Sequence, residues 1–253
     1  MDFDNLVKKY NFNTGDILLY QHVNTYEGFS SYLFNFIDSG IKYFTKSKYT
    51  HVAMIIKNPP WNDELKGLYI LESNMETIPD VEDNKLKCGV ELIPLEKALE
   101  CKSNIYYLRK LHCRRNYSFY NKLIDAHSLV YNKSYDLIIT DWLKAILKIN
   151  IGDVRRTNTF WCSALVSYLY CKLGFVRKDI PWTIISPKDL GTENPKESLE
   201  FINCVVDKEI KLETLIKTNK TNKTNKTNKT NKTNKTNKTN KTNKNKDLIN
   251  KTT

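Results

Sequence analysis

The sequence has no apolar run that reaches the roughly 18 residues of a membrane-spanning helix, so we expect no transmembrane segment. Its first nine residues, Met1 to Lys9, also lack a basic stretch followed by an apolar one, which is the pattern of a secretory signal. We therefore expect a protein that is not secreted. The repeated Asn-Lys-Thr sequons near its C-terminus are then expected to remain without glycans.

The six cysteines form no C-x-x-C pair, and none has a metal-ligand spacing with the four histidines. We therefore expect no metal and no cofactor. Reduced thiols are the simplest state of these cysteines and are typical of a reducing compartment such as the cytoplasm. The abundance of asparagine, lysine, isoleucine and tyrosine is similar to that of proteins from AT-rich genomes, including large DNA viruses, for which the virion is a second location.

Little of the net charge of +12 belongs to the part of the chain that can fold. Residues 217–253 hold a Thr-Asn-Lys repeat with twelve lysines and one aspartate, which leaves 28 basic and 27 acidic groups elsewhere, a net charge of +1. We predict a folded domain at 1–210 and a disordered tail at 211–253, because the repeat has too little apolar surface to offset chain entropy.

The near-neutral domain argues against a specific nucleic-acid partner. The tail is expected to be a solvated extension, with weak contact to an anionic polymer or a membrane as the alternative.

Apolar segments separated by turns predict strands at 15–20, 51–56, 68–73, 90–94 and 104–109. Helical spacing predicts helices at 29–44, 119–130, 141–147 and 162–173, a short helix near 186–190, and a closing strand at 201–206. Because no long helices separate most of the strands, we predict an α+β fold in which an antiparallel sheet packs against helices.

The most informative residue is Cys162, which stands where an aromatic turn runs into an apolar helix. The start of a helix exposes unpaired N–H groups and the positive end of the helix dipole, which favour a reactive thiolate. The alternative is a buried and inert thiol.

A nucleophilic cysteine needs a base and a polar group that orients the base. Of the four histidines, His51 stands at the entrance of an apolar strand, and Glu72 lies toward the end of the next strand. If these strands are antiparallel neighbours, the carboxylate can reach the ring N–H of the histidine. The alternatives are a structural histidine at a strand start and a solvated acid at a strand end.

These pieces occur in an order that resembles a known family. The chain is similar to the circularly permuted papain-like cysteine hydrolases of the NlpC superfamily, and within it to the YiiX-like proteins and their poxvirus relatives. The matching segments are Gly15-Asp16-Ile17, Thr50-His51-Val52, Leu71-Glu72, Tyr135-Asp136, Trp161-Cys162-Ser163 with the helix that follows, and Ser186-Pro187-Lys188-Asp189-Leu190. They span about residues 13–191. The chain departs from the pattern at Ala164, where relatives often carry glutamate.

The resemblance implies a permuted papain-like fold with Cys162 as nucleophile, His51 as its base and Glu72 as the residue that orients His51. We accordingly predict a thiol hydrolase or acyltransferase that acts on an amide or ester through a thioester. A peptide or other amide substrate is favoured over a lipid ester. The alternative is a catalytically silent interaction module, or a virion component, with the same fold.

Overall fold

The computed structural model describes residues 1–23, 47–75, 78–135, 155, 157–193 and 198–216. The helices expected at 29–44 and 141–147, Asp136 of the Tyr-Asp pair and the Thr-Asn-Lys repeat lie outside the described residues. Within the described ranges, no helix is long and apolar enough to span a membrane.

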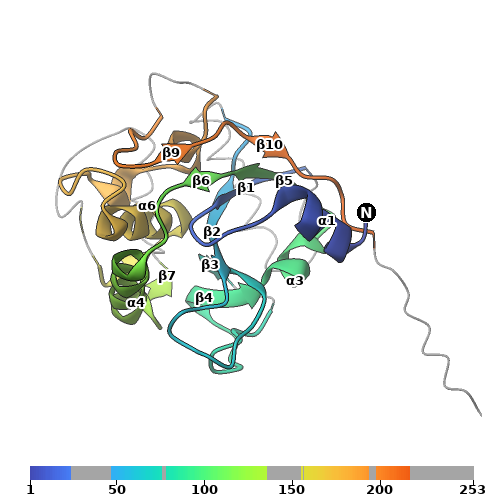
Figure 1. The fold of residues 1–253 in the computed structure, drawn as a ribbon, viewed down its shortest axis with the longest axis horizontal. Coiled ribbons are helices and arrows are strands. Elements are labelled where there is room, and N and C mark those ends of the chain that lie inside the picture. The colour runs from blue at the N-terminus through green and yellow to red at the C-terminus, as the bar shows by residue number, and fades with distance from the viewer. Residues whose placement is uncertain (24–46, 76–77, 136–154, 156, 194–197, 217–253) are drawn as a thin grey trace, which may run out of the picture. The chain divides into compact units, whose positions relative to one another are not determined.

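An eight-stranded curled sheet forms the centre of the fold (Figure 1). Its strand order is β10-β5-β1-β2-β3-β4-β7-β8, and neighbouring strands are antiparallel except for the last pair, β7 and β8. The strands are β1 (Ile17–His22), β2 (His51–Lys57), β3 (Leu68–Met75), β4 (Cys88–Pro94), β5 (Asn104–Arg109), β7 (Ser134–Tyr135), β8 (Thr159–Phe160) and β10 (Ile210–Lys211). The predicted α+β class is confirmed.

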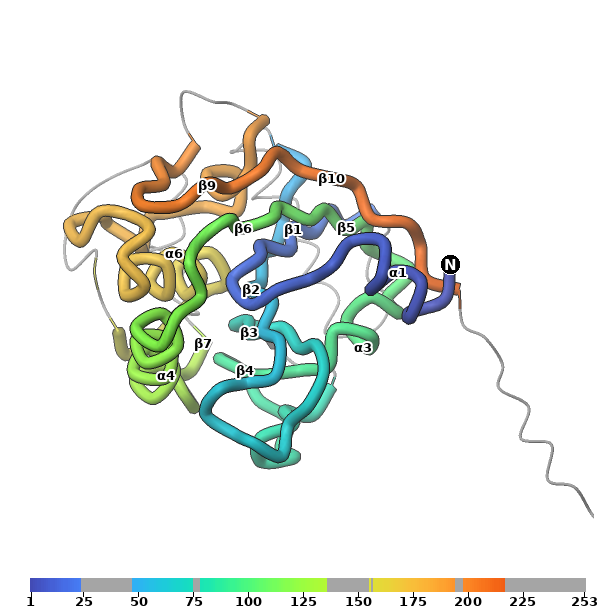
Figure 2. Tube along the Cα trace, viewed as in Figure 1, coloured from blue at the N-terminus to red at the C-terminus, as the bar shows by residue number. Residues whose placement is uncertain are grey.

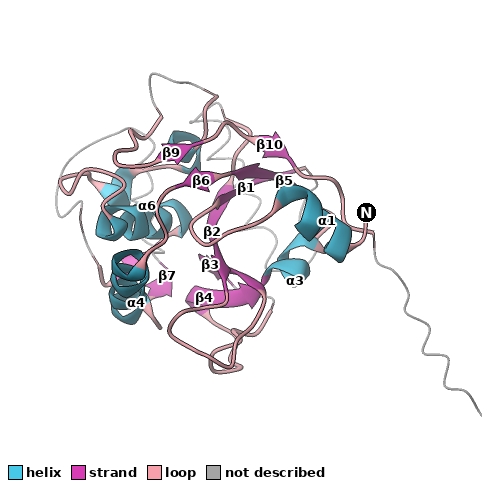
Figure 3. Ribbon diagram, viewed as in Figure 1, coloured by secondary structure: helices cyan, strands magenta, loops and turns pink. Residues whose placement is uncertain are grey.

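Figure 3 shows the helices in cyan beside the strands of this sheet in magenta. They are α1 (Phe3–Tyr10), α3 (Leu95–Leu99), α4 (Tyr117–Val130) and α6 (Cys162–Leu173), with short 3-10 helices η1 (Trp182–Ile184) and η2 (Pro187–Leu190). The predicted helices at 119–130, 162–173 and 186–190 are therefore present. Helices α1 and α3 are not among the helices predicted from the sequence.

Alternation along the strands builds a separate core on each face of the sheet. In β2, Val52, Met54 and Ile56 pack into the core that holds the apolar residues of α4 and α6. Ala53 and Ile55 point to the other core, which α1 and α3 complete. Because both faces are covered, the middle of β2 is an unbroken apolar run and its ends are the places where polar groups can stand.

Helix α6 lies in the first of these cores, and all its residues except Lys172 are buried. It ends at Gly174, whose backbone has a φ of 82°, the left-handed conformation that glycine adopts without strain. Burial on all sides fixes the position of the helix and therefore of Cys162, its first residue.

The C-terminal part of the described chain returns along the sheet edge, beside β5 and β6 (Figure 2). Here the closing strand expected at 201–206 is shortened to β9 (Val205–Val206), which pairs with β6 (Leu111–His112) in a separate two-stranded sheet. The backbone N–H of Ile202 instead donates to the carbonyl of Phe175, so the beginning of that segment is tied to a loop. Packing continues beyond residue 210, because Leu212 is buried in the second core.

Candidate active site

The structure brings His51 and Glu72 into direct contact. His51 opens β2, and its Nε2 lies 2.6 Å from Oε2 of Glu72 in β3. Met54 pairs with Leu71, so the same register places Glu72 opposite Ala53. His51 lies two residues before Ala53 and on the same face of the strand, so His51 and Glu72 are diagonal neighbours. Strand β3 continues to Met75, so Glu72 lies inside the strand rather than at its end.

Cys162 is the second partner of the His51 ring. Burial lowers the pKa of His51, but the charges of Cys162 and Glu72 and side-chain hydrogen bonds to both outweigh burial and raise that pKa to about 10. Because Nε2 faces Glu72, Nδ1 is the ring nitrogen left for Cys162. The three residues predicted from the sequence thus lie together at one end of the sheet.

Only a small part of this group is exposed to solvent. The Glu72 side chain is 2% exposed, Cys162 is 5% exposed, and the His51 side chain retains 17% of its surface. A buried carboxylate that is bonded to a partly open imidazole fixes the ring without closing it off from solvent.

Tyr20 is a member of the site that the sequence interpretation did not include. It pairs directly with His51 across β1 and β2. Its hydroxyl donates to Oε2 of Glu72 at 3.1 Å, and its ring meets the His51 ring edge-on at 4.7 Å between centroids. Burial, and next the charge of Glu72, raise the pKa of Tyr20 well above its usual value, so its hydroxyl remains a donor. The signal that could have found it is the register of the first two strands.

Glu72 has a further contact in Asn74, whose Nδ2 lies 3.5 Å from Oε1. Oε2 of Glu72 is therefore in contact with His51 and Tyr20, and Oε1 is in contact with Asn74. Such a set of partners holds the carboxylate in one orientation.

The segment that carries Cys162 is fastened to the sheet beside Glu72. Ser73 Oγ donates to the carbonyl of Phe160 at 2.6 Å, and on the other side Ser163 Oγ donates to the carbonyl of Ile185 at 2.7 Å. The residues that make these two bonds, Phe160 and Ser163, stand on either side of Cys162 in the sequence, so the beginning of α6 is held in two places.

The first turn of α6 keeps hydrogen-bond donors available. Trp161, the N-cap residue, provides no side-chain cap to the helix. Its own indole Nε1 is buried and has no hydrogen-bond partner within the described part of the chain. The early backbone N–H groups of a helix have no partner inside the helix, and they lie next to the thiol of Cys162.

The other three histidines lie against other polar groups. His22 Nδ1 is 2.9 Å from Asn104 Oδ1, His112 Nε2 is 2.7 Å from Asp207 Oδ2, and His127 Nε2 is 3.1 Å from Glu82 Oε2. His127 also stacks on the ring of Trp61 at 3.8 Å between centroids. None of these contacts includes a cysteine.

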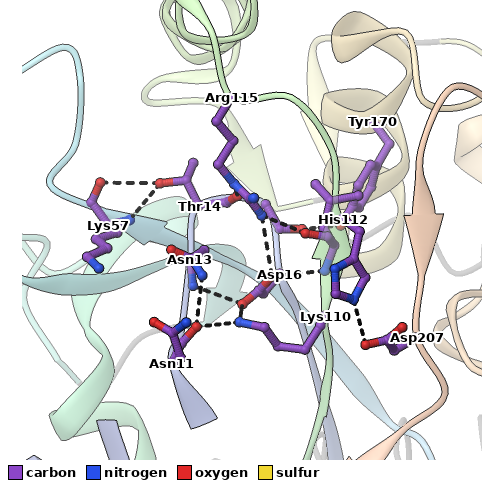
Figure 4. A network of polar contacts seen from close by, with 12 residues as sticks. Asn11, Asn13, Thr14, Asp16, Lys57, Lys110, His112, Arg115, Tyr170 and Asp207 are labelled. Carbon is purple, nitrogen blue, oxygen red and sulfur yellow. Dashed lines mark hydrogen bonds and ion pairs between the residues drawn. The ribbon is translucent and has the colours of Figure 1, made fainter. Parts of the chain in front are cut away.

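The Gly-Asp pair of the first strand serves a different purpose (Figure 4). Asp16 is completely buried and accepts hydrogen bonds of 2.9 Å from the backbone N–H groups of Asn13 and Leu111. It also pairs with Lys110 and, at 3.6 Å, with Arg115. Asp16 therefore ties the beginning of β1 to β6 and to the loop before α4, four residues from Tyr20 along the strand.

The segment Ser186 to Leu190 is likewise structural in its contacts. Ser186 and Asp189 form a capping box at η2, with the Asp189 carboxylate 2.7 Å from both the backbone N and the Oγ of Ser186. Tyr135, the described half of the Tyr-Asp pair, lies in β7 and pairs with Phe160 of β8.

No cluster of three or more histidine, cysteine or acidic side chains that could hold a metal ion occurs among the residues that the structure describes. No disulfide joins the six cysteines, of which Cys88 and Cys101 are exposed and Cys162 and Cys171 are buried.

Comparison with known proteins gives a limited result. Neither the protein-family models nor the curated proteins contain a match to this chain. Among solved structures, the chain is similar to the metalloprotein YiiX from Escherichia coli O157:H7, with 16% sequence identity and a TM-score of 0.40 over 80% of this chain and 97% of that one.

Proposed function

We propose that this chain is a thiol hydrolase or acyltransferase that cleaves an amide or ester bond, with Cys162 as nucleophile, His51 as base and Glu72 orienting His51. The observation that supports it best is the surroundings of the His51 ring, whose Nε2 lies 2.6 Å from Oε2 of Glu72 and whose pKa is raised to about 10 by the charges of Cys162 and Glu72 and by side-chain hydrogen bonds to both. This is the arrangement that nucleophilic catalysis by a thiol requires.

In the first half of the proposed reaction, His51 holds the proton of the Cys162 thiol, and the sulfur attacks the carbonyl carbon of the substrate. The carbonyl π electrons move to oxygen, and a tetrahedral intermediate forms. The intermediate collapses as the bond to the leaving amine or alcohol breaks, and the His51 imidazolium gives its proton to that leaving group. The product of this half-reaction is a thioester on Cys162.

In the second half, neutral His51 takes a proton from water or from another acceptor, which attacks the thioester carbonyl. The C–S bond breaks, and the thiol of Cys162 recovers its proton through His51. Water as acceptor makes the protein a hydrolase, and an amine or alcohol makes it an acyltransferase. Glu72 holds the ring in place in both halves and stabilises its charged form.

Negative charge on the carbonyl oxygen needs hydrogen-bond donors in both half-reactions. The backbone N–H of Cys162 at the start of α6 is the first donor that we propose. The indole N–H of Trp161, a buried donor without a described partner, is the second.

The proposal includes the permuted papain-like fold of the NlpC superfamily, because the histidine strand precedes the cysteine helix in this chain. A peptide or other amide substrate is favoured over a lipid ester. The chemistry needs a reduced thiol, so we propose that the protein acts in a reducing compartment such as the cytoplasm.

The test compares the reactivity of Cys162 with its exposure. Iodoacetamide is applied to the intact chain at mildly acidic pH, and labelling of each cysteine is followed by peptide mass spectrometry. If His51 activates the thiol, Cys162 reacts faster than the exposed Cys88 and Cys101, and the His51→Ala variant loses this advantage. Cys88 and Cys101 serve as internal controls, because their labelling should be unaffected by His51→Ala.

The opposite result is that Cys88 and Cys101 react first and that Cys162 reacts slowly at the same rate in both proteins. That result would contradict an activated nucleophile and favour the catalytically silent module. A panel of peptide anilides and acyl esters then identifies the bond that is cleaved, with Cys162→Ala as the blank.

A further inference from the structure

Cys113 and Cys204 lie outside the candidate active site and come from distant parts of the sequence, yet the strand register sets them opposite each other. In the antiparallel pair of β6 and β9, Leu111 faces Val206 and His112 faces Val205. Cys113 directly follows β6 and Cys204 directly precedes β9, so extending this register by one residue sets them opposite each other.

The hydrogen bonds between β6 and β9 show whether Cys113 and Cys204 occupy a hydrogen-bonded or a non-hydrogen-bonded position. The backbone N–H of Asp207 donates to the carbonyl of Lys110 at 2.9 Å, so Lys110 and Asp207 form a hydrogen-bonded pair. Pairs alternate along an antiparallel ladder, so Cys113 and Cys204 fall at a non-hydrogen-bonded position. At such positions the Cα atoms are about 4.5 Å apart and the side chains approach closely, within the range of about 4.4–6.8 Å that disulfides require.

Side-chain direction agrees with this register. Both cysteines are half-buried and pack against the same core as Leu111 and Val206, the inward residues of the two strands. His112 lies between Leu111 and Cys113 in the sequence, and Val205 lies between Cys204 and Val206. Both are exposed, on the opposite side of the ladder. The two thiols are therefore on one side of the ladder.

The electrostatic environment of Cys204 agrees with this register, because it includes the charge of Cys113. Burial, and next the charge of Cys113, raise the pKa of the Cys204 thiol to about 11. Burial also raises the pKa of Cys113, although the neighbouring charge of Arg115 opposes it. Both cysteines also contribute to the environment of Tyr170, whose hydroxyl is bonded to the carbonyl of Gly15.

We propose that Cys113 and Cys204 are a redox-modification site that forms an intramolecular disulfide and fastens the C-terminal segment to β6. The oxidant is a small-molecule disulfide such as oxidised glutathione. The Cys113 thiolate, which is favoured by Arg115, attacks one sulfur of the oxidant and releases one glutathione thiolate. The Cys204 thiolate then attacks the Cys113 sulfur of the mixed disulfide and releases the second. Two electrons pass to the oxidant, and the protons of the two cysteines end on the two glutathione thiols.

The raised pKa values predict slow formation, because few thiolates are present at neutral pH. Once formed, the bond closes a loop that contains α4, α6 and the candidate nucleophile. Closing a loop of that length stabilises the folded state mainly by restricting the unfolded chain. For a domain of this size, we expect the melting temperature to rise by about 10 °C.

The experiment treats the full chain with oxidised glutathione, blocks remaining thiols with iodoacetamide in denaturant, and maps peptides without reduction. The expected product is a peptide pair joined through Cys113 and Cys204, with a higher melting temperature that dithiothreitol reverses. The Cys113→Ser and Cys204→Ser variants should lose both the cross-link and the temperature shift. The matched variant Cys101→Ser changes an exposed cysteine and should retain both.

The proposal is overturned if Cys113 and Cys204 remain fully alkylated after oxidation while Cys88 and Cys101 carry glutathione. It is also overturned if the temperature shift persists in Cys113→Ser. Neither result depends on Cys162, so the outcome is separate from that of the proposed hydrolase activity.

Discussion

Two buried carboxylates, Asp16 and Glu72, show how the same chemical group can serve different purposes in one sheet. Asp16 is surrounded by backbone N–H groups and by Lys110 and Arg115, which are charged at all ordinary pH values. Glu72 is bonded instead to a tyrosine hydroxyl and to His51, which can gain or lose a proton and is partly open to solvent. The first set of partners holds the backbone together, and the second transmits the carboxylate's charge to a group that can react.

The largest effect expected from this comparison is on activity. Replacing the proposed nucleophile, Cys162→Ala, should reduce turnover of the cleaved substrate by about 10³–10⁶-fold. The fold should be retained, because the side chain is only shortened to a methyl group at the start of a helix that is held elsewhere by its core. Steady-state kinetics and circular dichroism measure the two quantities on the same sample. Equal activity of the two proteins would contradict the proposed role of Cys162.

A large effect on stability is expected at the other carboxylate. Asp16→Ala leaves the Lys110 ammonium and two backbone N–H groups without their acceptor, so we expect the free energy of unfolding to fall by about 3 kcal/mol. Urea unfolding followed by circular dichroism measures it. Asp16→Asn is the matched control, because it keeps an acceptor oxygen and removes the charge. An unchanged midpoint in both variants would show that the network is not structural.

Glu72→Gln tests whether its carboxylate acts through His51. Because a neutral amide stabilises the protonated ring less than a carboxylate does, we expect turnover to fall by about 10²–10⁴-fold while KM changes less. The pKa of His51 should also fall, since the charge of Glu72 helps to raise it. A variant with normal turnover and an unchanged pH profile would assign Glu72 to packing alone.

Tyr20→Phe should give the smallest effect, because it removes one hydrogen bond to Glu72 and keeps the edge-on ring against His51. The lost bond is worth about 1 kcal/mol, and we expect turnover to fall by about fivefold. A positioning role predicts that the pH profile of turnover shifts as well, which a purely structural role would not produce. Tyr106→Phe, at a neighbouring ring, is the control for general disturbance of this core.

Much of the sheet could be predicted because its strands are short apolar runs with clear ends. Val52, Met54 and Ile56 alternate with residues of the opposite core, and the polar residues His51 and Glu72 mark where this apolar pattern is interrupted. Helix α6 was predicted by its spacing and by Gly174. Helix α1 also has a signal, because Phe3, Leu6, Val7 and Tyr10 follow a helical period.

Other features could not be predicted because they depend on register between strands. Tyr20 joins the site because β1 pairs with β2 at one particular offset, and no local pattern marks that offset. The pairing of β7 with β8 involves two residues in each strand, which is too short for a periodic pattern. Gly89 permits β7 to approach β4, because a side chain there would collide with the carbonyl of Lys133.

The raised pKa of His51 also links protonation to stability. The folded-state value of about 10 lies above the ordinary 6.5, so protonated His51 stabilises the fold fully below pH 6.5. This contribution is lost as the pH rises through about 10. Cys162→Ala should remove most of the dependence over that range, because it removes the charge that contributes most to the raised value.

The most direct test of the central claim is an NMR titration of the His51 ring, with His51→Gln to assign its signal. Our account predicts that the ring stays protonated through neutral pH and titrates near pH 10 in the intact chain. In Cys162→Ala the midpoint should fall by more than one unit. A midpoint close to 6.5 that does not change in Cys162→Ala would show that His51 and Cys162 do not form a working pair, and would contradict the account.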